Sequence, residues 1–171
     1  MSEAGTHSAI ARARAGQRAT PPLPSLATIQ AALTEVPDPE LPVLSVVDLG
    51  IVHRVGVGPD GIQVVILPTF VGCPALDVIR ASIADRLAAF GLPVRVDTTF
   101  EVPWTSERIS PAGRRALAAV GIAPPSEPDL VRCPFCASGS VVMDSAFGPT
   151  QCRSLYYCRA CRQPFEALKA V

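Results

Sequence analysis

The sequence carries no excess of charge of either sign. Its 15 basic and 15 acidic residues cancel, and charged residues make up only 18% of the chain. A protein that binds nucleic acid or an anionic membrane over a broad surface usually has a basic surplus there. The composition therefore argues against nucleic acid as a general partner, and function has to come from individual sites.

Long apolar runs and a secretory signal are also missing. No run approaches the roughly 18 to 20 apolar residues of a membrane-spanning helix, so we expect a cytoplasmic protein with no membrane partner. Residues 1–24 show no apolar periodicity and end in a proline-rich run, which predicts a disordered tail. Their arginine content also suits a mitochondrial transit peptide, although Glu3 and the lack of an amphipathic stripe argue against one.

The common catalytic motifs are absent as well. The chain has only two histidines, and neither stands with a serine and a second acid in a pattern typical of a hydrolase. It also has no glycine-rich phosphate-binding loop. We therefore expect no catalytic residues and no catalysis of the protein's own.

What the sequence does have is cysteine in a regular arrangement. Five of its six cysteines lie in residues 133–171, and four of these form the pairs Cys133/Cys136 and Cys158/Cys161, with 21 residues between the pairs. Each Cys-x-x-Cys can fold into a tight knuckle, and two knuckles supply the four sulfurs of a tetrahedral zinc site. The spacing predicts structural zinc in a zinc ribbon, with two disulfides or rubredoxin-like iron as alternatives. Cys152 has no partner at this spacing, and we expect it to be structural or weakly reactive rather than a fifth ligand.

The predicted zinc ribbon covers residues 131–171. Its hairpin strands are expected at Val141 to Asp144 and Leu155 to Tyr157, with the turn near residues 147–150. About 40 residues cannot bury enough apolar surface to fold alone, so the metal would contribute much of the folding free energy. The proline-rich segment 123–130 before the ribbon is predicted to be a linker.

The chain before this linker predicts a small α+β domain over residues 25–122. The spacing of its apolar residues alternates between that of a helix and that of a strand, and it predicts the order helix, strand, strand, helix, strand, helix. Alternation along the first strand places His53 on the apolar face. The expected elements are a helix from Ser25 to Val36, strands from Ile51 to Val57 and from Gln63 to Leu67, a helix from Pro74 to Phe90, a strand from Val94 to Phe100 and a helix from Ser110 to Val120.

The sixth cysteine, Cys73, falls where the second predicted strand passes through a short loop into the second helix. Unpaired backbone N–H groups and the positive end of a helix dipole favour a thiolate, which lowers the thiol pKa and makes a better metal ligand or nucleophile. A small buried residue in a tight turn is the alternative. Asp38, Glu40 and Asp48 lie in the loops after the first helix, where turn formation and helix capping also explain acidic residues.

Three loop segments together resemble a known family. They are Asp38-Pro39-Glu40-Leu41-Pro42, the segment from Ser45 to Val52 with Asp48-Leu49-Gly50 inside it, and Pro68-Thr69-Phe70-Val71-Gly72-Cys73-Pro74. In this combination the region from Leu26 to Val120 resembles the α+β domain of the SufT-type iron–sulfur assembly factors. With further segments added, the chain is similar to the PaaD family, the accessory proteins of phenylacetyl-CoA epoxidase systems. These segments are the paired cysteines, Pro103-Trp104-Thr105-Ser106, Ile109-Ser110, Phe147-Gly148-Pro149-Thr150 and Pro164-Phe165-Glu166.

The resemblance implies roles that spacing alone leaves open. It assigns Cys73 to the transient handling of iron or an iron–sulfur cluster, and it assigns Asp38, Glu40, Asp48 and Thr69 to the supporting loops. It implies an accessory or maturation factor for the iron–sulfur reductase component of the epoxidase. A lone thiol cannot complete a four-sulfur site, so the cluster would bridge two copies in a homodimer or be shared with the client.

Many relatives carry Tyr and Ser where this chain has Phe70 and Val71, so hydrogen bonds from those two hydroxyl groups cannot be required here. Two other functions stay open. One is a zinc-ribbon module that binds protein or nucleic acid, for which Arg153, Arg159 and Arg162 would form a local basic patch. The other is a thiol redox protein that uses Cys73, although no resolving cysteine lies near it in the sequence.

Overall fold

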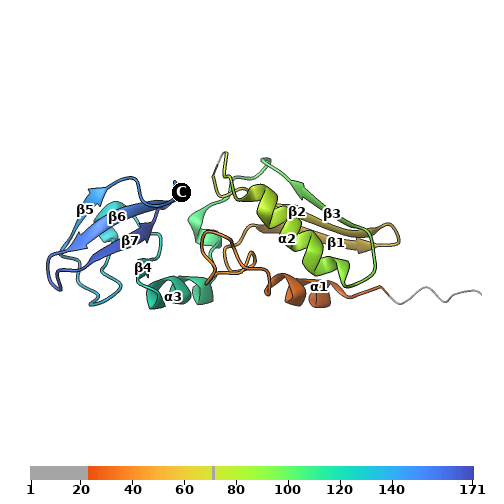
Figure 1. Ribbon diagram of the computed structural model, residues 1–171, viewed down its shortest axis with the longest axis horizontal. Coiled ribbons are helices and arrows are strands. Elements are labelled where there is room, and N and C mark those ends of the chain that lie inside the picture. Colours follow the sequence, from red (N-terminus) through yellow and green to blue (C-terminus); the bar gives the residue numbers. More distant parts are fainter. Residues whose placement is uncertain (1–22, 71) are drawn as a thin grey trace, which may run out of the picture.

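The computed structural model describes residues 23–70 and 72–171. The predicted tail therefore lies outside the described residues, apart from its last two, and so does Val71. The described chain is α+β, as the sequence predicts, and has two halves, each built around its own sheet (Figure 1). The first half contains α1 (Leu26–Leu33), β1 (Val52–Gly58), β2 (Gly61–Ile66), α2 (Leu76–Ala88), β3 (Val94–Thr98), the short helix η1 (Ser106–Arg108) and α3 (Pro111–Ala119). The second half contains β4 (Ile122–Ala123), the short helix η2 (Pro128–Leu130), β5 (Val141–Ser145), β6 (Arg153–Cys158) and β7 (Pro164–Leu168).

The first half is organised by a three-stranded sheet of order β1-β2-β3. β1 and β2 form an antiparallel hairpin, and β2 runs parallel to β3, with Val64 opposite Val96. A parallel pair needs a crossover connection, and α2 provides it. α2 packs on β3, and α1 packs on both α2 and β1. The αββαβα order predicted from the periodicity is confirmed.

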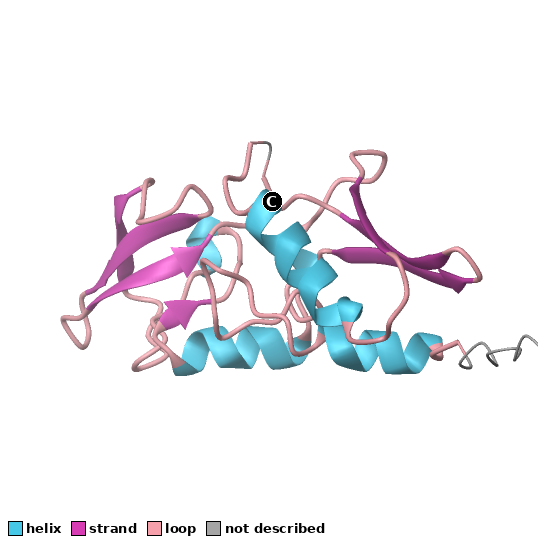
Figure 2. Ribbon diagram, turned by 45° about the vertical axis from the view of Figure 1, so that its right-hand side comes forward, coloured by secondary structure: helices cyan, strands magenta, loops and turns pink. Residues whose placement is uncertain are grey.

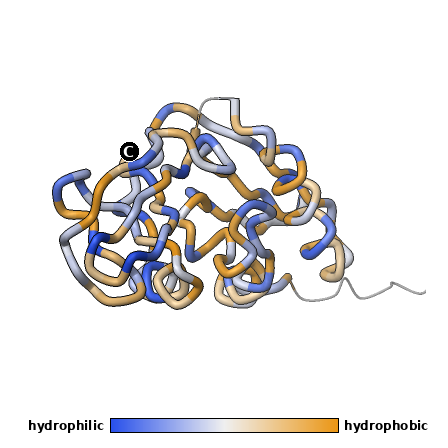
Figure 3. The backbone as a smooth tube through the Cα atoms, turned by 60° about the vertical axis from the view of Figure 1, so that its left-hand side comes forward, coloured by the Kyte–Doolittle hydropathy of each residue, from blue (hydrophilic) through white to orange (hydrophobic). Residues whose placement is uncertain are grey.

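A continuous apolar core lies between these helices and the sheet. Its largest fully buried side chains are Ile29, Leu33, Leu44, Val46, Ile51, Ile62, Val64, Ile66, Leu67, Ile83, Leu87 and Leu117. Burying each of them contributes roughly 1.5–3 kcal/mol, so this half has a substantial core of its own. Hydrophobic stretches, orange in Figure 3, run through both halves of the chain. Among the described residues, no helix is long and apolar enough to cross a membrane.

Two local predictions in the first half are wrong. α2 begins at Leu76 rather than at Pro74, and its N-cap Ala75 makes no side-chain capping bond; Cys73 lies in the loop before the helix, as predicted, but two residues before the N-cap. His53 is exposed rather than on the apolar face, because the register of the β1–β2 pair shifts between Val52 and Arg54. Such a bulge interrupts the alternation that the prediction assumed.

The second half contains a four-stranded sheet of order β4-β7-β6-β5, which lies at the left of Figure 2. β5 and β6 form the predicted antiparallel hairpin. β7 and β4 were not predicted: β7 pairs antiparallel with β6, and Ile122 of β4 lies opposite Glu166 of β7 in a parallel pair. The chain therefore joins the second sheet directly after α3. The domain division at residues 123–130 stays a prediction.

The two halves contact each other near the C-terminus, which lies between them (Figure 1). Leu168, at the end of β7, is 4% exposed and packs into the core of the first half. The backbone N–H of Ser106 donates to the carbonyl of Val171 at 3.2 Å, and Nη2 of Arg153 donates to the carbonyl of Glu40 at 3.3 Å. These contacts hold the β5–β6 connection, residues 146–152, against the loops of the first half.

Candidate functional site

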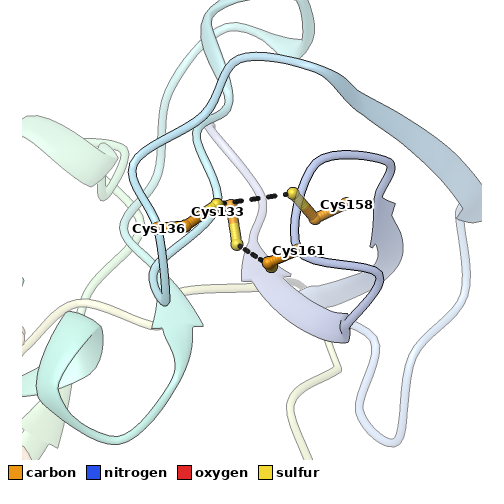
Figure 4. A group of neighbouring side chains, drawn as sticks. All are labelled: Cys133, Cys136, Cys158 and Cys161. Carbon is orange, nitrogen blue, oxygen red and sulfur yellow. Dashed lines mark hydrogen bonds between the residues drawn. The ribbon is translucent and has the colours of Figure 1, made fainter.

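Four cysteine side chains of the second half converge on one point (Figure 4). Cys133 and Cys136 come from the loop before β5, Cys158 is the last residue of β6, and Cys161 lies in the turn between β6 and β7. Their sulfur atoms all lie within 4.8 Å of one another. The Sγ atoms of Cys133 and Cys161 are 3.6 Å apart, and those of Cys136 and Cys158 are also 3.6 Å apart. The structure thus brings together the four residues that the sequence paired.

The two Cys-x-x-Cys knuckles share one backbone geometry. The residue after each second cysteine has a left-handed backbone, with a φ of 59° at Ala137 and of 61° at Arg162. Its N–H donates to the carbonyl of the first cysteine, at 2.8 Å in both knuckles. A left-handed residue other than glycine costs on the order of 1 kcal/mol or more. Because both knuckles retain this conformation, the fold maintains the positions of the sulfurs at the expense of local backbone strain.

The four sulfurs fit a tetrahedral metal ion. Zn–S bonds of about 2.3 Å place the sulfurs of such a site about 3.8 Å apart, close to the distances here. Disulfides do not fit, since all six cysteines are free. The backbone N–H of Cys161 lowers the pKa of Cys158 to about 7, whereas burial and then the neighbouring thiols raise the pKa of Cys161 to about 12. This ligand set can hold a cation such as zinc.

A second group of candidate residues begins in the loop after α1. Asp38 is only 5% exposed, and its Oδ1 accepts the backbone N–H of Glu40 at 2.9 Å and that of Leu41 at 2.8 Å. Burial raises the pKa of Asp38, and these two hydrogen bonds oppose the rise. No described residue donates a hydrogen bond to its Oδ2. Asp38 therefore fixes the turn that carries Glu40 and keeps one carboxylate oxygen free of protein donors.

Asp48 connects two loops and the start of α3. The hydroxyl of Ser110 donates to its Oδ1 and the hydroxyl of Ser45 donates to its Oδ2, both at 2.7 Å. Both hydrogen bonds lower the pKa of Asp48, and the one from Ser110 has the larger effect. Gly50 has a φ of 71°, and a Cβ there would lie 2.3 Å from the carbonyl oxygen of Arg108. The Asp48-Leu49-Gly50 motif therefore holds loops together.

Cys73 lies in a half-buried pocket between the two halves of the protein. The cavity has a volume of about 270 Å³. A smaller space of about 20 Å³ adjoins it and reaches Asp38 and Trp104. The larger cavity is lined from the first half by Glu40, Thr69, Phe70, Cys73 and Pro74, and from the second half by residues 147–152.

The predicted lowering of the Cys73 pKa is wrong. Cys73 lies in the loop two residues before the N-cap of α2, and burial raises the pKa of its thiol. The N–H of Ala75 opposes this rise, whereas the nearby Glu40, Asp38 and Cys152 add to it. The free thiol therefore keeps its proton at neutral pH, and it becomes a thiolate when a bound cation stabilises the negative charge.

The sequence interpretation did not connect Cys152 with this pocket. Cys152 lies in the loop directly before β6, where its Sγ is 3.1 Å from Oγ1 of Thr150 and 3.9 Å from Oε2 of Glu40. It lines the same two cavities as Cys73. No motif spacing in the sequence relates these two thiols, because only the contact between the two halves brings them together.

The predicted site residues therefore separate into two sets. Asp38, Glu40, Thr69 and Cys73 line the adjoining cavities, whereas Asp48 lines neither. Phe70, which is 39% exposed, also lines the larger cavity.

Two protein families match different parts of the chain. Residues 26–99 match the family described as "Iron-sulfur cluster assembly protein", and residues 119–169 match the "PaaD zinc beta ribbon domain". The first match covers the sheet of the first half and also includes Cys73. The second begins at the end of α3 and includes all four converging cysteines together with Cys152.

Individual relatives support both parts. A protein of Escherichia coli (strain K12), described as one of the subunits of a 1,2-phenylacetyl-CoA epoxidase, is 37% identical over 156 residues, which cover 86% of this chain and 94% of that protein. The "Fe-S protein maturation auxiliary factor" of Porphyromonas gingivalis (strain ATCC BAA-308 / W83) is 38% identical over 81 residues, 46% of this chain and 76% of that protein. Among solved structures, the domain of unknown function DUF59 from Bacillus anthracis matches 53% of this chain and 89% of its own, with a TM-score of 0.50 and 27% identity.

Proposed function

Because this chain belongs to the PaaD family and combines an iron–sulfur assembly domain with a PaaD zinc ribbon, we propose that it is an accessory factor that supplies iron or an iron–sulfur cluster to a client protein. The client is the iron–sulfur reductase component of a phenylacetyl-CoA epoxidase. Cys73 holds the cargo transiently during this transfer. The protein does not oxidise the aromatic substrate itself.

The observation that carries this proposal is the place of Cys73 in the pocket between the two halves. Its thiol shares the adjoining cavities with the carboxylates of Glu40 and Asp38. Thiolate sulfur is the usual protein ligand of iron–sulfur clusters, and carboxylates also bind iron. No described histidine lines either cavity, so the cysteine–histidine pair that activates many nucleophilic thiols is not formed there. The residues present suit a carrier better than a hydrolase.

The proposed transfer begins and ends with a proton on Cys73. The raised pKa of Cys73 keeps the free thiol protonated, so uptake of iron displaces that proton to solvent as the Fe–S bond forms. When thiolates of the client take over the iron, Cys73 is released as a thiolate and regains a proton. The empty carrier is then an uncharged thiol, a weak nucleophile that resists oxidation better than a thiolate.

We propose zinc as the ion at the four converging cysteines of the second half. Zinc bound there contributes folding free energy directly. The second half needs this contribution, because two of the seven buried residues in its separate core are the ligands Cys133 and Cys158. A folded ribbon then forms one wall of the Cys73 pocket and offers a docking surface for the client.

The proposal predicts that Cys73→Ser folds normally and fails in the cell. Serine is nearly isosteric with cysteine, so the fold is retained, but its hydroxyl is a poor iron ligand at neutral pH. Cells that carry this variant in place of the wild type should accumulate reductase with a deficit of iron and sulfide. The reductase is purified anaerobically, and its iron and sulfide content and the growth of the strain on phenylacetate are measured.

Ala81→Ser is the matched control, because Ala81 is exposed on α2 and lies outside the pocket. It should support a full complement of cluster and normal growth. A Cys73→Ser strain whose reductase contains its full iron and sulfide, and which grows normally on phenylacetate, would overturn the proposed function.

The alternative of thiol redox chemistry is favoured by one observation, which is that Cys152 lines the pocket of Cys73. It provides the second thiol that the neighbouring sequence lacks. The alternative of nucleic-acid binding through the ribbon has less support. Arg153 pairs with Glu166 at 2.6 Å, so within the proposed basic patch only Arg159 and Arg162 stand exposed.

A further inference from the structure

We infer that Cys73 and Cys152 form one two-sulfur site, in which the ribbon half supplies the second ligand for the iron-containing cargo. This inference rests on the proposed function and names a further ligand in the same pocket. The two cysteines belong to different halves of the chain, yet both line the cavity of about 270 Å³ and the smaller space of about 20 Å³ that adjoins it.

Cys152 lies too far from the four ribbon cysteines to bind the same ion. β6 runs from Arg153 to Cys158, so Cys152 and Cys158 lie at opposite ends of this strand. At a rise of about 3.3 Å per residue, six residues separate their Cα atoms by roughly 20 Å. Cys152 therefore cannot serve as a fifth ligand or as a replacement ligand in the ribbon.

The loop that carries Cys152 is fixed by hydrogen bonds to its neighbours. The backbone carbonyl of Cys152 accepts the N–H of Lys169 at 2.9 Å, and Oγ1 of Thr150 lies 3.1 Å from its sulfur. Arg153 donates from Nε to Oγ1 of Thr150 at 3.0 Å and from Nη2 to the carbonyl of Glu40 at 3.3 Å. Arg153 thus connects the Cys152 loop directly to the loop of the first half that lines the pocket.

The carboxylates of Glu40 and Asp38 lie close to the two thiols. Oε2 of Glu40 lies 3.9 Å from the sulfur of Cys152. Asp38, which is 5% exposed, lines the smaller cavity, and its Oδ2 has no hydrogen-bond donor among the described residues. Among the described residues, no fully buried side-chain oxygen lacks a hydrogen-bond partner, so Oδ2 of Asp38 is open to the cavity and can accept a cation there.

The electrostatics of the pocket favour a bound cation. Burial raises the pKa of both Cys73 and Cys152, and the charge of Glu40 raises both further. The charge of Arg153 opposes the rise at Cys152, although Arg153 also pairs with Glu166 at 2.6 Å. Nζ of Lys169 donates to the carbonyl of Gln151 at 2.7 Å. A cation bound between the thiols would relieve the repulsion that their deprotonation creates.

The arrangement suits a cluster better than one iron ion. Among the described residues, only the four ribbon cysteines form a group of three or more metal-binding side chains whose ligand atoms lie within 4.8 Å of one another. Cys73, Cys152 and Glu40 are therefore too widely spaced for one ion to contact all three without movement. In a cluster, different irons take different thiolates. Two cysteines also complete only half of a four-cysteine set, which leaves the remaining irons accessible to thiolates of the client.

The test loads the full-length protein with Fe²⁺ and sulfide under anaerobic, reducing conditions. Wild type, Cys73→Ser, Cys152→Ser and Ala146→Ser are compared by iron, sulfide and zinc content and by visible absorption. Ala146→Ser is the control because Ala146 is exposed in the same β5–β6 connection, lines neither cavity and leaves both thiols in place. We expect each cysteine variant to bind iron at least about tenfold more weakly than wild type, with zinc content unchanged, and the control to match wild type.

A second measurement uses wild-type protein alone, so that it does not depend on how a variant folds. Loaded and unloaded protein are treated with iodoacetamide, and alkylation of each cysteine is quantified by mass spectrometry of its peptide. We expect loading to protect Cys73 and Cys152 together.

The outcomes separate this inference from the proposed function. If Cys73→Ser loses iron, Cys152→Ser retains it and loading protects Cys73 alone, the two-sulfur site is wrong and the proposed function stands. If wild type binds no iron or sulfide, both are wrong. A Cys73–Cys152 disulfide in wild-type protein that binds no cluster even after reduction would overturn both and favour redox chemistry.

Discussion

Replacing Asp48 tests whether the Asp48-Leu49-Gly50 motif has a structural role or belongs to the site that binds the cargo. Asp48 accepts hydrogen bonds from the hydroxyls of Ser45 and Ser110, both at 2.7 Å. Ser110 is also the N-cap of α3, because its Oγ accepts the N–H of Gly113 at 2.9 Å. The carboxylate thus holds the loop after α1 against the start of α3. In Asp48→Ala both hydroxyls lose their acceptor.

The expected magnitude follows from these two hydrogen bonds. A hydrogen bond to a charged group contributes about 1.5–3 kcal/mol. Asp48 is only partly buried, so water replaces some of the loss and the lower value applies to each bond. We expect Asp48→Ala to lower the free energy of unfolding by about 3 kcal/mol and to leave iron binding unchanged, because Asp48 lines neither cavity near Cys73.

Trp104 provides the assay. It is the only tryptophan in the sequence, is 6% exposed, and donates from Nε1 to the carbonyl of Leu49 at 2.9 Å, beside Asp48. Urea unfolding followed by its fluorescence therefore reports on the first half. Asp85→Asn is the control, since Asp85 is exposed on α2 and has no ion pair with a described residue. An Asp48→Ala protein within about 0.5 kcal/mol of wild type would refute the structural role.

The contribution of Asp48 should also depend on pH. Its hydrogen bonds lower the pKa of the folded carboxyl below its ordinary value of 3.8. The folded state therefore gains stability from ionised Asp48 above about pH 3.8 and loses this contribution as the pH falls through the lower folded pKa. The difference in unfolding free energy between wild type and Asp48→Ala should be constant near neutral pH and shrink in acid. A difference that grows as the pH falls would contradict the assignment.

Two further predictions concern the ribbon and Gly50. Cys133→Ser or Cys158→Ser should lose the ribbon metal and unfold the second half while Trp104 in the first half stays buried; a zinc-to-protein ratio near zero in the native protein would show that the metal has been misassigned. Gly50→Ala should cost at least about 2 kcal/mol in the same fluorescence assay, because its left-handed φ of 71° disfavours alanine and the new Cβ would lie 2.3 Å from the carbonyl oxygen of Arg108. Gly56→Ala is its control, since a Cβ there meets nothing within 4 Å.

Local patterns predicted the elements whose signals lie within a short stretch of sequence. The apolar spacing of Ile79, Ile83 and Leu87 predicted α2, and all three side chains are buried. The paired cysteines predicted a metal site because their four ligands come from only two tight turns, each with its own local hydrogen bonds. In both cases, neighbours in sequence are also neighbours in space.

Features that depend on contacts between distant segments could not be predicted in this way. β4 is two residues long and becomes a strand only because Ile122 and Ala123 pair with β7. The bulge that exposes His53 depends on how β1 registers with β2. The pKa of Cys73 was expected to fall because of a nearby helix N-terminus, but burial between two halves of the chain raises it.

Cys152 connects the ribbon to the pocket of the first half. Its sulfur is half-buried against the core of the first half, which also receives Leu168 from the end of β7. The C-terminal segment contacts both sides here: the N–H of Lys169 donates to the carbonyl of Cys152, and the N–H of Ser106 donates to the carbonyl of Val171. The four converging cysteines lie at one end of β6, and Cys152 lies at its other end. If the two-sulfur site proposed above is correct, folding of the ribbon around a metal is a condition for iron binding at Cys73, although none of the four cysteines lines that pocket.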